Sequence, residues 1–265
     1  MVATTQILRT LQLTDNEVRF YNAEGYLYLP GLVSHDAAAD MRAEVIEIMA
    51  GLGVSYERLC QTQGSGDKLR QTQQYLAGSK LDQLVNSPQL LDIASQLMQG
   101  PSTLYMSFTA VKNGGGGGKF HFHQDNMYTR FDGPGINIWF ALQEMSPENG
   151  CLMMAPRTHL RGTLDAVQSS DGDSHRMIRV EPEDFLPVRM MPGDAVAFTR
   201  LTLHGSGPNM TDEPRIGYAV QLHRDDVKAV WDRQEPRLLK SNPRWSTGPV
   251  DKITPPETDE KLDGH

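Results

Sequence analysis

Apolar residues recur at helical spacing in the first hundred residues of the chain. Thr14 and Glu17 fit a capping box, so a short helix is predicted to run to about Asn22. Ser34 precedes a second helix, and Ser87 with the proline after it begins a third. The second helix carries an apolar stripe that faces a core, made of Ala38, Met41, Val45, Ile48 and Met49.

The period changes from helical to alternating after residue 103. Apolar segments of strand length are separated by Gly, Pro, Asn and Asp, and both Asn149-Gly150 and Pro192-Gly193-Asp194 are typical turn sequences. The pattern predicts antiparallel strands in a sandwich or barrel. The predicted strands are residues 104–112, the segment around His123, and residues 136–142, 151–154, 188–190, 195–198 and 216–223, with an earlier strand at residues 26–29.

Helices that precede strands in a chain of 265 residues indicate a mainly β barrel with an N-terminal helical layer. We predict one domain over residues 1–265, with a core at about 16–225 and a tail, residues 232–265, that wraps the surface or frays. Residues 53–78 and 161–187 are long polar segments of the kind that often cover sites. The five glycines at 114–118 lack the spacing of a phosphate-binding loop and predict a flexible hairpin connection.

Charge and hydropathy exclude several classes of partner. The net charge is −8 and no run rich in Lys or Arg offsets it, which disfavours nucleic-acid binding. Mean hydropathy is −0.45, and no apolar run approaches the roughly 18–20 residues that span a bilayer. The N-terminus lacks the order of a signal peptide, so a cytoplasmic location is expected. Cys60 and Cys151 are too few for a disulfide framework and are predicted to be reduced core residues.

Two histidines and one carboxylate form the candidate metal site. His123 and Asp125 are two positions apart, so on a strand both side chains point to one side while Gln124 points away. Together with His204, far downstream, they match the two imidazoles and one carboxylate of non-haem Fe(II) oxygenases, which leave coordination positions open for oxygen and a co-substrate. The pair alone is a weak signal, because 8 histidines make a chance surface His–Asp pair common.

The motifs around this site resemble the phytanoyl-CoA dioxygenase family of Fe(II)/2-oxoglutarate-dependent oxygenases. The likeness extends from about Asn16 to Asp225 and implies a double-stranded β-helix, a barrel of two facing antiparallel sheets. The residues that carry it are Phe20 to Leu27, His123-Gln124-Asp125, Trp139, Glu148 to Leu152, Pro156 to His159, Pro192-Gly193-Asp194, His204-Gly205-Ser206 and Arg215.

The resemblance implies that His123, Asp125 and His204 are the iron ligands. His121 shares the strand parity of His123, but the family motif places the ligand next to Gln124. Halogenating relatives replace the carboxylate with a small residue, so the intact Asp125 implies hydroxylation-type chemistry rather than halogenation.

The resemblance also implies a binding site for 2-oxoglutarate. Arg215 matches the arginine that grips the distal carboxylate of this co-substrate, and a guanidinium offers a planar fork for a carboxylate. Ser206 matches a hydroxyl that adds a hydrogen bond, and Trp139 matches an aromatic residue that shapes the pocket. Many members carry a hydrogen-bonding glutamine where this chain has Met106. The candidates to supply this hydrogen bond instead are Tyr105, Ser107 and Thr109.

The implied reaction is hydroxylation of a small organic molecule, in which 2-oxoglutarate and O2 are consumed and succinate and carbon dioxide are released. A secondary metabolite is favoured over an acyl thioester, because no cluster suggests a site for the phosphates of CoA. The two long polar segments are candidate lids. Two alternatives remain open: a cupin-like oxygenase or isomerase that does not use 2-oxoglutarate, and a barrel that binds a ligand without turnover. The oligomeric state is not readable.

Other polar residues near the motifs have several interpretations. Gln124 is either a contact of the metal site or substrate, or a polar residue on the barrel exterior. Tyr128, Arg130 and Phe131 follow the ligands and are candidates to face a substrate. Structural roles are predicted for His159 and His223, and a core-filling role for Met153, Met154, Met190 and Met191.

Overall fold

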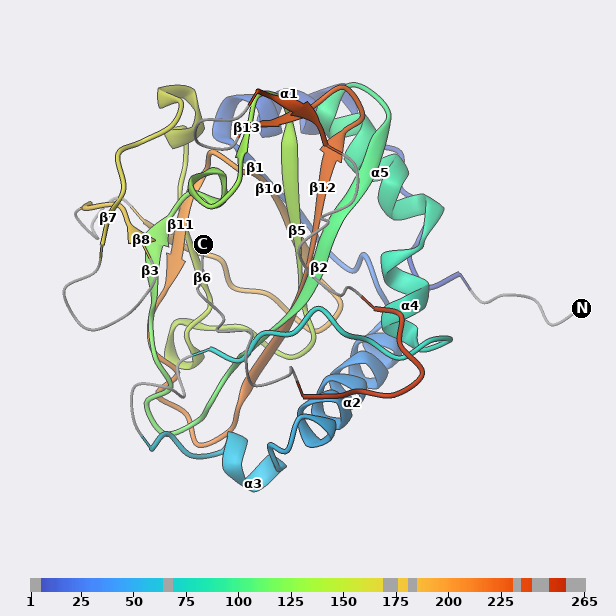
Figure 1. Cartoon of the computed structure of the whole chain (residues 1–265), viewed down its shortest axis with the longest axis vertical. Coiled ribbons are helices and arrows are strands. Elements are labelled where there is room, and N and C mark those ends of the chain that lie inside the picture. Colours follow the sequence, from blue (N-terminus) through green and yellow to red (C-terminus); the bar gives the residue numbers. More distant parts are fainter. Residues whose placement is uncertain are drawn as a thin grey trace, which may run out of the picture.

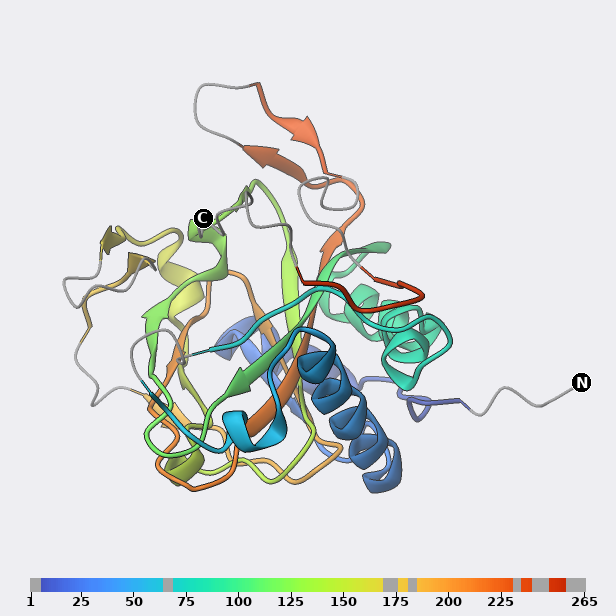
Figure 2. The same cartoon turned by 60° about the horizontal axis from the view of Figure 1, so that its bottom comes forward.

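Two facing β-sheets and a layer of helices make up the described part of the chain (Figure 1). The computed structural model describes residues 6–63, 69–168, 176–180, 185–230, 235–239 and 248–255. Helices cover the outer side of the larger sheet, and the smaller sheet faces its inner side (Figure 2). No helix in these segments is both long and apolar enough to cross a membrane.

The three predicted helices are confirmed, and they begin at the residues that the sequence marks as caps. The Thr14 hydroxyl accepts the Glu17 amide at 3.3 Å, while the Glu17 carboxylate accepts the Thr14 amide at 2.7 Å. The Ser34 hydroxyl accepts the Ala37 amide at 3.2 Å. Gly25 ends the first helix in the left-handed region, with φ of 84°. These helices are α1 (Asp15–Glu24), α2 (His35–Gly51) and α5 (Pro88–Met98).

Two further helices were not predicted from the sequence. The first backbone amides of the second one, those of Lys80 and Leu81, donate to the Glu44 carboxylate of α2 at 2.7 and 2.9 Å. Each helix has a serine N-cap, Ser55 and Ser79, but both are too short to show a helical period in the sequence, and tertiary contacts stabilise them. The two helices are α3 (Tyr56–Leu59) and α4 (Lys80–Val85).

The larger sheet has the strand order β1-β10-β5-β12-β2, and every neighbouring pair is antiparallel. Its strands coincide with predicted strands to within about two residues. Their bounds are β1 (Tyr26–Leu29), β2 (Ser102–Lys112), β5 (Gly135–Ala141), β10 (Ala195–Thr199) and β12 (Arg215–Arg224). This sheet is one wall of the predicted double-stranded β-helix.

The smaller sheet has the order β3-β11-β6-β9. The strand predicted at residues 188–190 is wrong: the paired strand is β9 (Leu186–Pro187), and Met190 forms an isolated bridge with Met145. The strand around His204 was not predicted as such. The other three strands are β3 (Phe120–His123), β6 (Leu152–Ala155) and β11 (Leu203–Ser206).

Short pairs and single turns complete the described structure. A three-stranded sheet lies beyond the end of β12 (Figure 2), formed by β4 (Arg130–Phe131), β13 (Lys228–Val230) and β14 (Arg237–Leu238). β7 (Val167–Gln168) pairs with β8 (Arg176–Met177). The 3-10 turns are η2 (Asp125–Met127), η3 (Pro147–Asn149) and η4 (Thr158–Arg161).

The larger sheet is buried on both faces, because helices pack on one face and the barrel interior lies on the other. Along each strand, successive side chains point alternately into one core and into the other. The outer core includes Ile136, Ile138, Phe140, Ile216, Tyr218 and Val220 together with the helices. The barrel interior includes Trp139, Met145, Cys151, Met154, Met190, Val196, Phe198 and Ala219. Cys60 and Cys151 are free thiols, whereas Met191 is 52% exposed and does not fill the core.

The glycine run is a fixed crossing between the two sheets, so the predicted flexible hairpin is wrong. The amides of Gly114, Gly115 and Gly116 donate to carbonyls of residues 59, 211 and 209, each at 2.8 Å. A Cβ on Gly114 would lie 2.5 Å from the Asp212 carbonyl oxygen. Gly114 is required because another backbone segment approaches it too closely for a side chain. Gly115 and Gly116 are required because their φ angles of 68° and 94° lie in the left-handed region.

The described part of residues 161–187 packs on the outer face of the smaller sheet. Leu164, Ile178 and Phe185 belong to a cluster with Phe122 and Leu203. These described residues therefore back the sheet and do not form the predicted lid; residues 169–175 and 181–184 lie outside the described chain. Arg176 borders the candidate site, since its Nη1 donates to the Met127 carbonyl at 3.4 Å.

The other predicted lid, residues 53–78, partly extends the larger sheet. The Arg70 amide donates to the Val111 carbonyl at 2.8 Å, and the Thr109 amide donates to the Thr72 carbonyl at 3.0 Å. The tail covers this segment in turn, because the Val250 amide donates to the Tyr75 carbonyl at 2.9 Å. The tail therefore wraps the surface where residues 248–255 are described; residues 64–68 lie outside the described chain.

Asp194 joins the edge strand β1 to the turn before β10. Its buried carboxylate accepts the Gly31 and Met191 amides, both at 2.7 Å, and the Tyr28 hydroxyl. Asp194→Ala should lower the free energy of unfolding by about 2–4 kcal/mol, because three donors lose their acceptor. Denaturant unfolding measures this. Asp40→Ala, at an exposed position of α2, is the control and should change stability by less than about 0.5 kcal/mol; equal losses would contradict the prediction.

Candidate metal centre

His123, Asp125 and His204 converge in the interior of the barrel. His123 ends β3 and is the cross-strand partner of His204 in β11. Both His Nε2 atoms lie 3.7 Å from Asp125 Oδ1. The three side chains are buried, and their ligand atoms all lie within 4.8 Å of one another. That separation is too long for hydrogen bonds and suits a cation between the three atoms.

The backbone carries Asp125 to this point in a different way from the prediction. β3 ends at His123, and Asp125 is the first residue of the turn η2. Gln124 between them is still extended, with φ of −108° and ψ of 135°, so His123 and Asp125 point to the same side. The prediction of a shared face is therefore right, although the two residues do not share a strand.

Gln124 points away from the candidate ligands, to the exterior of the barrel as in one of its two interpretations, but other segments bury it completely. Its Nε2 donates to the carbonyls of Gly162 and Leu201 at 3.0 and 2.7 Å. Its Oε1 accepts the Leu164 amide at 2.9 Å. Gln124 thereby ties the turn that carries Asp125 to the segments after η4 and β10.

Backbone carbonyls fix the orientation of both imidazoles. The Nδ1 atom of His123 lies 2.8 Å from the His121 carbonyl, and that of His204 lies 2.9 Å from the Thr202 carbonyl. A carbonyl only accepts, so each Nδ1 carries the proton and each Nε2 offers its lone pair toward Asp125. His121 thus contributes its backbone, and His123 contributes its ring. Burial, with the nearby His123, lowers the pKa of His204 to about 4, which keeps it neutral.

Asp125 stays ionised in spite of its burial. Burial alone would raise the pKa of this carboxyl, but the neighbouring His204 and His123 side chains and the charge of Arg200 together hold it well below its ordinary value. Asp125 Oδ2 accepts Asn137 Nδ2 and Gln221 Nε2, both at 3.2 Å. Two neutral imidazoles and one carboxylate are a donor set that fits a divalent iron ion.

Two buried cations lie side by side in the larger sheet. Arg215 on β12 is the register partner of Lys112 on β2, and both are almost fully buried. Arg215 Nη1 donates to the Ala110 carbonyl at 3.3 Å, and Lys112 Nζ donates to the Gly207 carbonyl. Among the described residues, no carboxylate oxygen lies within 4.0 Å of either charge. Burial lowers the pKa of Arg215 to about 10 and also lowers that of Lys112.

Trp139 and Ser206, which the sequence predicts for a co-substrate pocket, lie beside these cations or next to their contacts. The Arg215 guanidinium carbon lies 5.4 Å from the centre of the Trp139 ring. Ser206 is buried and immediately precedes Gly207, whose carbonyl accepts Lys112. Two buried cations without a protein counterion indicate a site for an anion. Lys112 was missed from sequence; the signal was a lysine at the end of an otherwise apolar strand.

Met106 lies on the inner face of the larger sheet, opposite Gln221. The residues that could have replaced its missing hydrogen bond point elsewhere. Ser107 accepts the Tyr218 hydroxyl at 3.0 Å in the outer core, and Thr109 accepts the Thr72 amide at 3.0 Å. The Tyr105 hydroxyl donates to Thr129 Oγ1 at 3.1 Å.

The residues after the ligands divide between the site and its surroundings. The Tyr128 ring lies 5.8 Å from that of His123, measured between centroids. Arg130 is exposed, and Phe131 is buried against Arg200. His159 is structural, as predicted, because its Nε2 contacts the Asn22 carbonyl at 3.0 Å; the Nδ1 of His223 likewise contacts a carbonyl, that of Arg224, at 2.8 Å.

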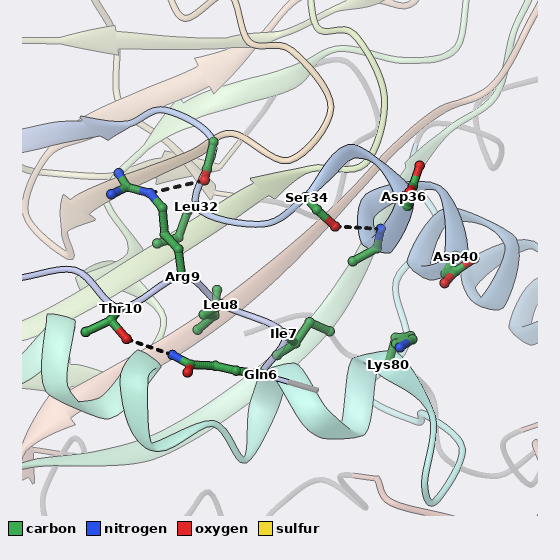
Figure 3. Close-up of a pocket in the computed structure, with 12 residues that line it drawn as sticks. Gln6, Ile7, Leu8, Arg9, Thr10, Leu32, Ser34, Asp36, Asp40 and Lys80 are labelled. Carbon is green, nitrogen blue, oxygen red and sulfur yellow. Dashed lines mark hydrogen bonds between the residues drawn. The ribbon is translucent and has the colours of Figure 1, made fainter. Parts of the chain in front are cut away.

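A surface pocket on the helical side contains none of the candidate site residues. Figure 3 shows residues 6–10 along one wall and the start of α2 along another. Its charged residues of both signs, Arg9, Asp36, Asp40 and Lys80, do not converge on a common point.

Comparison with known proteins agrees with the geometry of the site. The phytanoyl-CoA dioxygenase (PhyH) family profile matches residues 21–217. The chain belongs to this family. A methylphosphonate hydroxylase of Gimesia maris is 32% identical over 206 residues, which are 77% of this chain and 78% of that protein. A phytanoyl-CoA dioxygenase of Arabidopsis thaliana is 23% identical over 257 residues, covering 82% of this chain and 91% of the relative.

Solved structures of similar fold include EvdO2 of Micromonospora carbonacea var. aurantiaca complexed with 2-oxoglutarate. Its sequence identity is 23% and its TM-score is 0.65, and the match covers 87% of this chain and 97% of EvdO2. The carbocyclase SnoK of nogalamycin biosynthesis has 22% identity and a TM-score of 0.63, covering 85% and 92%. These likenesses confirm the double-stranded β-helix. Family membership and the His-Asp-His geometry together make this family member a non-haem iron, 2-oxoglutarate-dependent oxygenase of small molecules.

Gly217 makes room for the Trp139 ring inside the barrel. A Cβ at Gly217 would lie 2.2 Å from Trp139 Cζ2. Gly217→Ala should therefore displace the ring and weaken 2-oxoglutarate binding by about tenfold, with a stability loss of about 1–3 kcal/mol. Calorimetric titration with 2-oxoglutarate measures the first effect. Gly207→Ala is the matched control, since its Cβ would meet no atom within 4 Å; unchanged affinity in Gly217→Ala would contradict the assignment of Trp139 to this pocket.

Proposed function

We propose that His123, Asp125 and His204 hold Fe(II), and that the enzyme hydroxylates a small organic molecule with release of succinate and carbon dioxide. The observation that carries this proposal is the convergence of two imidazole Nε2 atoms on Asp125 Oδ1, each at 3.7 Å, in a buried site. Both rings donate through Nδ1, so in the neutral imidazole the other nitrogen, Nε2, offers a lone pair to a metal.

Arg215 and Ser206 bind the distal carboxylate of 2-oxoglutarate in this proposal, and Lys112 adds a second positive charge. The buried Arg215 Nε has no hydrogen-bond partner among the described residues, which supports a carboxylate as its ligand. Trp139 lies against Arg215 and keeps the guanidinium in position. With O2, the bound iron and co-substrate supply an oxidant that is strong enough to attack a C–H bond.

Aromatic side chains shield the candidate ligands from water. The Phe120 ring lies 4.5 Å from the His123 ring, and the Phe198 ring lies 4.5 Å from the His204 ring. An apolar wall around the ligands protects the oxidant from unproductive reactions. The carboxylate of Asp125 also occupies the position that a halide would need, which supports hydroxylation over halogenation.

A short-chain phosphonate is the substrate class that we test first. Support comes from the Gimesia maris relative, a methylphosphonate hydroxylase, which matches 77% of this chain at 32% identity. The neighbours from nogalamycin biosynthesis support a natural-product substrate less strongly, because at 22% identity or below their likeness concerns the fold. A panel of alkylphosphonates and natural-product intermediates, assayed by stimulated succinate release, separates the two classes.

Asp125→Ala tests the proposed iron site. The variant should lose more than about 99% of substrate-dependent succinate release, because it lacks the single anionic ligand of the metal. Its iron content after reconstitution should fall as well. Asp165→Ala, which removes an exposed carboxylate, is the control and should keep wild-type turnover. Turnover like that of the wild type in Asp125→Ala would rule out the assignment, and iron without succinate release in the wild type would favour a non-catalytic barrel.

Arg215→Met tests the use of 2-oxoglutarate. The KM for 2-oxoglutarate should rise by at least about tenfold, because a charge-assisted contact with its carboxylate is lost. Lys112→Met should raise this KM by a smaller factor. Arg237→Met removes an exposed arginine of β14 and should leave it unchanged. If Arg215→Met keeps the wild-type affinity for 2-oxoglutarate, a cupin-like oxygenase or isomerase without this co-substrate becomes the better hypothesis.

A further inference from the structure

The oxygen of Asp125 that faces away from the imidazoles is held by a pair of amides. Asn137 on β5 and Gln221 on β12 are register partners, and they are only 3% and 5% exposed. Each donates a side-chain NH to Asp125 Oδ2 at 3.2 Å. Oδ2 is thereby engaged by two donors, and Oδ1 alone faces His123 and His204. A carboxylate held in this way presents one oxygen to a metal.

The amide of Gln221 acts in this way only if its nitrogen points toward Asp125. An amide group can rotate, and it would then present its carbonyl oxygen to the carboxylate, which repels it. Arg200 Nη1 donates to Gln221 Oε1, and this contact excludes the rotated form. The same guanidinium reaches the backbone of the ligand, since its Nη2 donates to the Asp125 carbonyl at 2.8 Å and to the Thr129 carbonyl at 3.2 Å.

Arg200 is itself fixed in place. Only 4% of the residue is exposed, and its guanidinium carbon lies 4.0 Å from the centre of the Phe131 ring and 5.5 Å from that of Tyr105. A Cβ on Gly135 would lie 2.5 Å from Arg200 Cδ, so the strand leaves room for this side chain. Burial lowers the pKa of Arg200, whereas the charge of Asp125 raises it. A buried guanidinium is costly for folding, which points to a role beyond packing.

We propose that Arg200 is a positioning residue of the iron site. It fixes the Gln221 amide and the Asp125 backbone, so that Asp125 binds iron through Oδ1 alone. One-oxygen binding leaves coordination positions for 2-oxoglutarate and O2. The inference rests on the proposed assignment of Asp125 as an iron ligand. Arg200 does not touch the reacting atoms. The Arg215–Lys112 site lies at the start of β12, whereas Gln221, which Arg200 contacts, lies toward the end of this strand.

The test measures how fast the iron-loaded protein releases Fe(II) to a chelator, together with kcat and the KM for 2-oxoglutarate. Arg200→Met and Gln221→Leu should each accelerate release and lower kcat by at least about tenfold, while the KM changes less than about threefold, because residues at the Arg215 end are unaltered. Arg200→Lys should recover part of both effects. Arg157→Met, which removes an exposed arginine, is the control. Circular dichroism and thermal melting identify variants that fail to fold.

The double variant separates positioning from simple stability. If Arg200 acts through Gln221, Arg200→Met combined with Gln221→Leu should release Fe(II) no faster than the more affected single variant. Multiplied effects would overturn the inference, and so would wild-type release and kcat in folded Arg200→Met. Asp125→Ala belongs in the same assay. If that variant also retains iron, the proposed iron site fails; if it loses iron while folded Arg200→Met retains it, only the role of Arg200 fails.

Discussion

The antiparallel pairing of β3 with β11 is the interaction on which the candidate site depends. It places His123 directly opposite His204, and a register shift after this pair brings Ser206 opposite Phe120. Gly205 makes the shift possible, because a Cβ there would lie 2.5 Å from Phe122 Cδ1. One irregularity in the smaller sheet thus sets the positions of two candidate metal ligands and of Ser206, the proposed co-substrate contact.

Side chains of the larger sheet support the candidate metal ligands, which lie on the strands of the smaller sheet or directly after them. Its inner face holds Asn137 on β5 and Gln221 on β12 beneath the Asp125 carboxylate. Arg215 lies farther along β12, paired with Lys112 on β2. These polar residues are buried in an otherwise apolar interior, where an unpartnered polar group is costly. The division explains why the sheet needs a helical layer: helices bury its outer face, so that the inner face is free to carry polar side chains.

Much of the fold was predictable from the sequence, because caps and alternation are local signals. Thr14 and Ser34 mark helix starts through contacts with residues only three positions farther along the chain. The strands of the larger sheet follow from apolar segments between turns. The failures involve partners that are distant in sequence. The glycine run is fixed by residues 59, 209 and 211, and Gln124 by residues 162, 164 and 201. The family motif identified His123, Asp125 and His204, whereas Lys112 and Arg200 carry no motif. Lys112 emerges from its strand register with Arg215, and Arg200 from its hydrogen bonds to Gln221 and the Asp125 carbonyl.

The charge of the interior is opposite to that of the whole chain. The protein carries a net charge of −8, yet Arg200, Arg215 and Lys112 are all buried in or beside the barrel. Asp125 is the one carboxylate found near them in the described structure. Arg200 is compensated by carbonyls and by Asp125, but Arg215 and Lys112 have no carboxylate of their own among the described residues. Folding therefore bears a desolvation cost that only an anionic ligand can offset. In the proposed function, the carboxylate of 2-oxoglutarate is the anion that offsets this cost.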